Sequence, residues 1–235
     1  MSVNGTPQTY TQVCLIIQEY AQLTPSLSAS TDAGVLIAHG RPNLDAYMVY
    51  ARIVAQAADQ GAANALAKSV VITSANGTIS ASPERVDSPQ ALQIGFEIFS
   101  APTTNLTLTA SAGDVAVDQY NATLRVTATA GNASLQNVQG DVTIDIGAGS
   151  LEAKLSGSGW SGAGMSASTQ TGSISVSRPT AYQAAFTAQS SSGTASIDNK
   201  QATATGQEPA VVTAGSGPPI TLKSKVGNVS VLATQ

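Results

Sequence analysis

A glycine recurs along this 235-residue chain with the same apolar positions on either side of it. The residues seven and five positions before each copy are apolar or alanine, and so are those two and four positions after it. A recurring unit with constant internal spacing is the signature of repeat architectures, so the pattern predicts a repeat protein. We call this pattern the template, and its glycines are Gly34, Gly77, Gly113, Gly131, Gly149, Gly172, Gly193 and Gly227.

Each repeat unit predicts two short β-strands joined by a turn. Apolar residues alternate with others before and after the glycine, as expected for strands that bury one face. Around Gly113, for example, Leu106 and Leu108 precede the turn, and Val115 and Val117 follow it. Glycine is expected at the turn because a positive φ, or a close approach of stacked backbones, leaves no room for a Cβ.

The units must stack, because a lone two-strand unit cannot bury its apolar face. Three consecutive glycines (113, 131 and 149) fall 18 residues apart, and the later spacings of 23, 21 and 34 indicate loop insertions after Gly149 and Gly193. The predicted fold is all-β: a single-stranded β-solenoid (β-helix) of about 8 or more turns, on the order of 40 Å long at about 4.8 Å per turn. A β-sandwich with evenly spaced hairpins is the alternative.

The N-terminal third is less regular. Residues 57–68 are alanine-rich and predict one short helix near the N-terminal end, packed against the rod. Long strands are expected over residues 46–54 and 92–98. Residues 1–26 form an N-terminal lead-in, and residues 27–235 form the β-solenoid domain. The chain ends on the repeat itself, which predicts a free strand edge and a homo-oligomer formed through the C-terminal solenoid edge.

Composition argues against several classes of function. The net charge is −4, and the ten Lys and Arg residues form no cluster, so no nucleic acid is expected as a partner. Cys14 and His39 are the only cysteine and histidine, so no metal or other cofactor is expected, and nothing in their spacing links them into a catalytic pair. The apolar run Val13–Ile17 is too short to span a membrane, so no direct membrane insertion is expected.

Three aromatic residues are the candidate ligand-binding residues. Trp160 is the sole tryptophan and lies in a glycine-rich insertion, while Tyr120 and Tyr182 lie in comparable corners between turns. An aromatic side chain on a loop that leaves a rigid scaffold can stack on a sugar ring. The alternative is that each side chain folds back over the rod as a lid.

A group of acidic residues allows an enzymatic alternative. Asp114, Asp118, Asp141 and Asp145 lie within two predicted turns, with Arg125 one turn away. Clustered carboxylates beside a base are typical of β-helical polysaccharide lyases, and stacked carboxylates can also bind calcium. No known calcium-loop spacing is present, so ordinary solvated surface is the alternative for these residues.

Several segments resemble the bacterial putative-adhesin family, whose β-helical domains are of unknown function. The resemblance covers the glycine turn and the arginine-proline pair near residue 42, the strand-helix-strand region, the lead into the regular turns and the tryptophan region. The family's usual tryptophan after the first glycine turn is absent here. The segments are Gly34–Ala46, Tyr47–Ile79, Phe96–Pro102 and Trp160–Tyr182.

The resemblance implies an exported protein of the cell envelope with an adhesive or scaffold role and no catalytic residues. The expected function is therefore that of a non-catalytic surface protein, an adhesin or a rigid binding or spacer module. The expected location is extracytoplasmic (envelope, periplasm or cell surface), with an export segment absent from this sequence. A glycan or a cell-surface protein is the expected partner, and a lyase-like polysaccharide-active enzyme is the alternative.

Overall fold

The protein is described by a computed structural model that covers residues 10–20, 24–82, 91–205 and 207–234. This part of the chain is mostly β-structure with one α-helix. Its elements are β1 (Tyr10–Tyr20), β2 (Ser26–Ala33), β3 (Leu36–Gly40), β4 (Tyr47–Ala57), α1 (Gln60–Lys68), β5 (Val71–Ala75), β6 (Thr78–Ser82), β7 (Ala91–Ser100), β8 (Asn105–Ala112), β9 (Val115–Asp118), β10 (Asn121–Ala130), β11 (Ala133–Gln136), β12 (Gln139–Ala148), β13 (Leu151–Lys154), β14 (Gly164–Thr171), β15 (Ile174–Pro179), β16 (Ala185–Ser190), β17 (Thr194–Ile197), β18 (Lys200–Thr203), β19 (Ala210–Ala214), β20 (Pro219–Val226) and β21 (Val229–Thr234).

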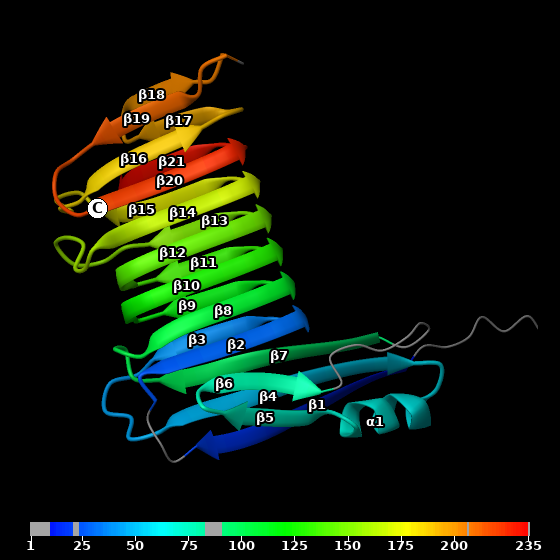
Figure 1. Ribbon diagram of the computed structural model, residues 1–235. Helices are drawn as coiled ribbons and strands as arrows, with labels where there is room; N and C mark the ends of the chain where they lie inside the picture. The colour runs from blue at the N-terminus through cyan, green and yellow to red at the C-terminus, as the bar shows by residue number, and fades with distance from the viewer. Residues whose placement is uncertain (1–9, 21–23, 83–90, 206, 235) are drawn as a thin grey trace, which may run out of the picture.

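The strands form two mixed sheets. Sheet A has 11 described strands in the order β1-β4-β7-β3-β9-β11-β13-β15-β21-β17-β18, and sheet B has 10 in the order β19-β16-β20-β14-β12-β10-β8-β2-β6-β5. Successive strands of the repeat alternate between the two sheets, so that β8, β10 and β12 lie in sheet B while β9, β11 and β13 lie in sheet A. Figure 1 shows the resulting stack, which broadens at the end that holds β1, β4 and α1.

Equivalent positions of the repeat face one another across the parallel strands. In sheet B, Leu124 pairs with Leu106 on one side and with Val142 on the other, one template position in three successive units. The inward side chains of both sheets form one hydrophobic core. The predicted register is therefore confirmed, and the same row of sheet B reads Leu27, Leu106, Leu124, Val142, Met165, Ile220 and Phe186.

The template glycines stack directly on one another between the strands. Gly113, Gly131 and Gly149 have φ values of +141°, +146° and +149°, a region that L side chains rarely adopt. A Cβ added to Gly131 would overlap the carbonyl oxygen of Gly113, and one on Gly149 would overlap that of Gly131. Glycine is thus needed for its backbone conformation and for the close approach of neighbouring turns.

The residue after each glycine extends this contact with a polar ladder. The Asn132 backbone N–H donates to Asp114 Oδ1 at 2.8 Å, and the Ser150 N–H donates to Asn132 Oδ1 at 3.0 Å. The Ser173 N–H in turn donates to Ser150 Oγ at 3.1 Å. These side chains satisfy backbone donors at the turn, where the strand ladder is interrupted.

Gly77 does not belong to the stack, so its assignment as a repeat unit was wrong. It lies with Asn76 in the tight turn between β5 and β6, which pair antiparallel. Both residues have positive φ, +52° for Asn76 and +77° for Gly77. The reason is local: Asn-Gly is the preferred pair for a two-residue type I′ turn, which closes a hairpin instead of opening a new turn of the stack.

The predicted free edge at the C-terminal repeat is also wrong. β20 and β21 follow β16 and β17 in the chain, yet each pairs in parallel on both of its sides, between β14 and β16 or between β15 and β17. In Figure 1 the red strands lie inside the stack. The outer positions are taken by β18 and β19, which pair antiparallel with β17 and β16. The last repeat therefore has no open side, because the chain doubles back before forming it.

The N-terminal part follows the expected outline. The helix expected over residues 57–68 is α1, which begins after the N-cap residue Asp59, whose Oδ1 accepts from the Ala62 N–H at 2.8 Å. The helix packs against β1 and β4. β1 lies within the expected lead-in and forms the edge of sheet A, where it pairs with β4. No helix in the described residues is long and apolar enough to cross a membrane.

Candidate functional site

The three aromatic residues expected to bind a ligand are buried. Trp160, Tyr120 and Tyr182 are 6%, 1% and 7% exposed, so none of them offers a ring face to solvent. Trp160 Nε1 donates to the Gly140 carbonyl oxygen at 3.0 Å, which holds the glycine-rich insertion against the stack. The burial contradicts the ligand-stacking interpretation and agrees with the alternative, in which these side chains fold back over the rod.

Burial also changes the chemistry of the two tyrosines. It raises the pKa of Tyr120 from 10.0 to about 12, partly opposed by the hydrogen bond between Tyr120 Oη and Ser100 Oγ (2.7 Å). Burial alone raises the pKa of Tyr182 to about 12. The Tyr182 hydroxyl has no hydrogen-bond partner in the described part of the chain. Both phenols are structural groups that stay neutral well above neutral pH.

Asp141 and Asp145, two of the acidic residues considered for an enzymatic role, form hydrogen bonds between neighbouring turns. Asp141 Oδ1 accepts from the Ala163 N–H at 2.7 Å, and Asp145 Oδ1 accepts from Ser168 Oγ at 2.8 Å. Arg125 lies opposite Thr143, and no described residue forms an ion pair with it. Over the described ranges, no three His, Cys, Asp or Glu residues are grouped to hold a metal ion.

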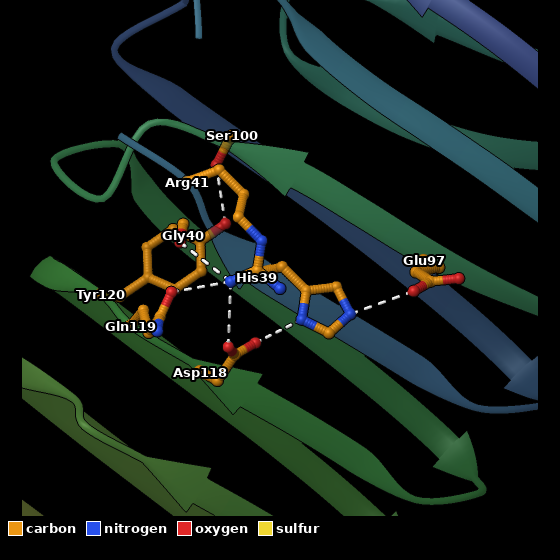
Figure 2. A network of polar contacts seen from close by, with 8 residues as sticks. All are labelled: His39, Gly40, Arg41, Glu97, Ser100, Asp118, Gln119 and Tyr120. Carbon is orange, nitrogen blue, oxygen red and sulfur yellow. Dashed lines mark hydrogen bonds and ion pairs between the residues drawn. The ribbon is translucent and has the colours of Figure 1, made fainter. Parts of the chain in front are cut away.

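A charged network that the sequence interpretation missed lies on the outer face of sheet A, at the wide end (Figure 2). His39 on β3 stands between two carboxylates. Its Nδ1 contacts Asp118 Oδ1 on β9, and its Nε2 lies 3.0 Å from Glu97 Oε1 on β7. The strand register brings them together, because His39 pairs with Asp118 on one side and with Phe99 on the other. The imidazole thus links three strands that are far apart in the sequence.

Arg41 and Phe99 complete the network. Arg41 Nη1 donates to Asp118 Oδ2 at 3.2 Å and to Gln119 Oε1 at 2.7 Å, and its guanidinium lies 5.9 Å from the Phe99 ring centre. The His39 ring stacks on Phe99 with centroids 4.8 Å apart. The repeat contained a signal for this pairing, since His39 and Asp118 both stand five residues after a stacked glycine and therefore face each other.

The network holds side chains from neighbouring strands in place. The nearby hydroxyl of Ser100 is buried and engaged by Tyr120. Cys14 lies on β1, and β4 and β7 separate it from β3 in the sheet. Each ion pair is partly exposed, so each contributes modestly to stability, roughly 1 kcal/mol or less. Within the network, the Glu97 carboxylate is positioned by one contact, with His39 Nε2.

A surface hollow of about 370 Å³ lies beside this network on the same face of sheet A. Glu97 belongs to both. Arg52 also lines the hollow, and among the described residues it has neither a hydrogen bond nor an ion pair. Val35, at 44% exposed, contributes part of its apolar wall. The full lining is Gly34, Val35, Ile37, Tyr50, Arg52, Val54, Gln93, Gly95, Phe96 and Glu97.

The solved structures that are similar to this chain include three of low sequence identity. A protein described as a putative cell adhesion protein from Clostridium sporogenes has a TM-score of 0.44 at 10% identity, covering 97% of this chain and 100% of that one. A putative adhesin from Bacteroides fragilis has a TM-score of 0.39 at 15% identity, with 93% and 97% covered. A putative adhesin from Parabacteroides distasonis has a TM-score of 0.34 at 10% identity, with 92% and 97% covered.

Comparison with curated proteins found no match. A family profile, in contrast, matches almost the whole of the described fold, from β2 to β21. The matched residues are 26–232, and the family is described as Toastrack DUF4097. This span includes the stacked glycines, the His39 network and the surface hollow. The chain therefore belongs to the Toastrack DUF4097 family.

Proposed function

We propose that this chain is a non-catalytic surface protein, in which stacked strands form a β-solenoid that serves as a rigid spacer with a binding face at its wide end. The observation that carries the proposal is the constant parallel register from β8 to β15, with a glycine in contact with the next glycine at every turn. We expect such a stack to keep its two ends at a fixed distance and in a fixed relative orientation.

Rigidity follows from how the turns are joined. Neighbouring turns share strand hydrogen bonds in both sheets. The contact between stacked glycines leaves no free space between one turn and the next at that point. The polar ladder of Asp114, Asn132 and Ser150 adds a further link at each turn. A displacement of one turn against the next would break all three kinds of contact at once, so we expect the stack to bend little.

The binding face is the outer surface of sheet A around the hollow. Its residues come from β3, β4, β7 and the turn before β3. It combines apolar walls with a carboxylate and with a guanidinium that has no partner in the described part of the chain, a mixture typical of binding pockets. An extracytoplasmic location fits a spacer that presents such a face to a glycan or to a cell-surface protein.

The location can be tested by labelling intact cells of the native host. In a Cys14→Ser background, Ser134→Cys places a thiol at an exposed position of β11, and Ala133→Cys places one at the adjacent buried position. A membrane-impermeant maleimide is expected to label the first variant on intact cells, and the second only after unfolding. Labelling of the Ser134→Cys variant only after lysis would place the protein inside the cell and contradict the proposal.

The enzymatic alternative requires a separate assay. A lyase-like enzyme would convert an acidic polysaccharide into an unsaturated product that absorbs ultraviolet light. We expect no such absorbance on prolonged incubation, because Asp141, Asp145 and Arg125 form no common group. A product that disappears in an Arg125→Gln variant would establish the alternative.

A further inference from the structure

We propose that the hollow in sheet A binds an acidic sugar residue, a pyranose ring that carries a carboxylate, with Arg52 as the anchor for the carboxylate. This inference rests on the proposed role as a binding module and names the class of its ligand. Three features support it: the close-packed backbone at the base of the hollow, the charge of Arg52, which has no partner among the described residues, and the arrangement of the groups around it.

Two glycines at the base of the hollow let neighbouring backbone segments pack closely. Gly95 on β7 stands opposite Arg52 on β4, so no side chain from β7 covers the guanidinium at that point. Gly34, beside it, has a φ of +152°, and a Cβ there would overlap the Ile94 carbonyl oxygen. A Cβ on Gly95 would approach the Val35 carbonyl oxygen to 2.8 Å. The backbone of Ile94 and Val35 therefore occupies the space of the missing side chains, and closely packed backbone forms the base of the hollow.

Arg52 is the positive group in the lining of the hollow, and it lacks a partner in the described residues. Arg41 and Arg178, in contrast, are paired with Asp118 and Asp198. A guanidinium presents its donors in a planar fork that matches a carboxylate, and charge-assisted bidentate bonds are about twice as strong as neutral ones. The ligand therefore carries an acidic group.

The remaining lining matches a sugar ring better than a simple anion or a fatty acid. Tyr50, Ile37 and Val54 provide aromatic and aliphatic surface for the C–H face of a ring. Gln93 and Glu97 provide acceptors for hydroxyl groups. The hydrocarbon chain of a fatty acid would displace water from Gln93 and from the free oxygen of Glu97 without replacing its hydrogen bonds, so a fatty acid is disfavoured.

His39 prepares Glu97 for this role. Glu97 Oε1 is held by His39 Nε2 at 3.0 Å, while its other oxygen has no hydrogen bond to a described residue. With the carboxylate fixed and its side chain still 43% exposed, the free oxygen can accept a ligand hydroxyl at little cost in side-chain entropy. The hollow of about 370 Å³ lies in the size range of small-molecule sites and accommodates one monosaccharide unit.

The test is isothermal titration of the purified chain with trigalacturonate, with neutral galactotriose and acetate as comparison ligands. We expect binding of trigalacturonate, at least tenfold weaker binding of galactotriose and of acetate, and weaker trigalacturonate binding as salt is raised. The Arg52→Gln variant should lose at least tenfold in affinity, since it lacks the bidentate charge. The matched control is Lys223→Gln, which removes an exposed positive charge from β20 of sheet B and should bind as the unchanged chain does.

Three outcomes would overturn the inference: equal binding of galactotriose, equal binding of acetate, or unchanged affinity in Arg52→Gln. Equal binding of acetate would reduce the hollow to a simple anion site. Circular dichroism of each variant verifies that the fold is retained, as expected for exposed side chains. None of these outcomes affects the labelling of intact cells, so the surface location and the ligand class fail or stand separately.

Discussion

The regular stack and the wide end are built from the same two sheets but use their outer faces differently. From β8 to β15, outward positions carry mostly small polar side chains, such as Thr107, Thr143 and Ser134, which repeat with the turns. Around β3, β4 and β7 the outward positions carry His39, Glu97 and other large or charged groups. The stack is uniform along its length, whereas the wide end has a specific chemical surface.

This difference shows what repetition provides and what it excludes. A template that places a glycine and four apolar residues in every turn specifies a backbone, and the side chains it leaves free are similar from turn to turn. The ion pairs found among the described residues lie outside the middle of the stack. Three of them hold the His39 network, and Arg178–Asp198 joins β15 to the segment after β17. The ion pairs are therefore concentrated toward the two ends of the stack.

The largest expected effect is on the glycine stack. Gly131→Ala combines a strained φ of +146° with overlap against the Gly113 carbonyl oxygen, so we expect the free energy of unfolding to fall by about 3 kcal/mol or more. Gly157→Ala is the control, since Gly157 also has a positive φ (+80°) but lies in open space. It should cost only about 1 to 2 kcal/mol. Urea unfolding measures both, and equal losses would mean that turn-to-turn contact is not the cause.

The next effect concerns the insertion between β13 and β14. Trp160→Ala removes a buried ring and should lower the free energy of unfolding by about 3 kcal/mol. Trp160→Phe keeps most of the burial but loses the hydrogen bond to the Gly140 carbonyl, so it should cost less, roughly 1 to 2 kcal/mol. Thermal unfolding compares the two. Unchanged stability together with lost trigalacturonate binding would instead support Trp160 as a ligand-binding residue.

A third effect depends on pH. Folding raises the pKa of Tyr120 and Tyr182 from 10.0 to about 12, so their neutral forms favour the folded state fully below pH 10, and this contribution is lost between about pH 10 and 12. Each tyrosine should lower the free energy of unfolding by about 1.4 kcal/mol per pH unit in that window. Urea unfolding at several pH values measures the slope. A Tyr120→Phe/Tyr182→Phe variant with the same slope would contradict the assignment.

The smallest effect tests the polar ladder. Asn132→Ala removes the acceptor for the Ser150 N–H and the partner of Asp114, so we expect a loss of about 1 kcal/mol. Ser134→Ala, two residues away on an exposed position of β11, should change stability by less than about 0.5 kcal/mol. Chemical unfolding of the pair distinguishes them. Equal stabilities would show that water replaces the Asn132 side chain without cost.

The sequence predicted the register well because the register depends on local spacing. Leu106, Leu124 and Val142 face one another as the template requires. The position of the last repeat could not be predicted in this way, since any unit can pair with any other of the same template. The order of β16, β17, β20 and β21 depends on β18 and β19, which turn back and pair antiparallel with β17 and β16. Gly77 was misplaced because the Asn-Gly turn also fits the template.

The candidate site was less accessible to sequence interpretation. His39 and Asp118 could have been paired by their equal distance from stacked glycines, but Glu97 comes from β7, which has no stacked glycine of its own. No pattern in the sequence marks Arg52 as a binding residue, because its lack of a partner among the described residues is a property of the folded surface. The sequence could not distinguish a ligand-binding Trp160 from a buried one, since a lone tryptophan in a glycine-rich loop is equally consistent with a buried lid.

The central claim is that the regular stack is a rigid support and that the hollow at the wide end binds the ligand. Amide chemical shifts measured during a trigalacturonate titration test it most directly, because they report on every part of the chain in one experiment. We predict shifts concentrated at residues 34–37, 50–54 and 93–97, around the hollow. Shifts centred on β8 to β15 or on residues 156–164, or the absence of shifts at the hollow, would contradict the account.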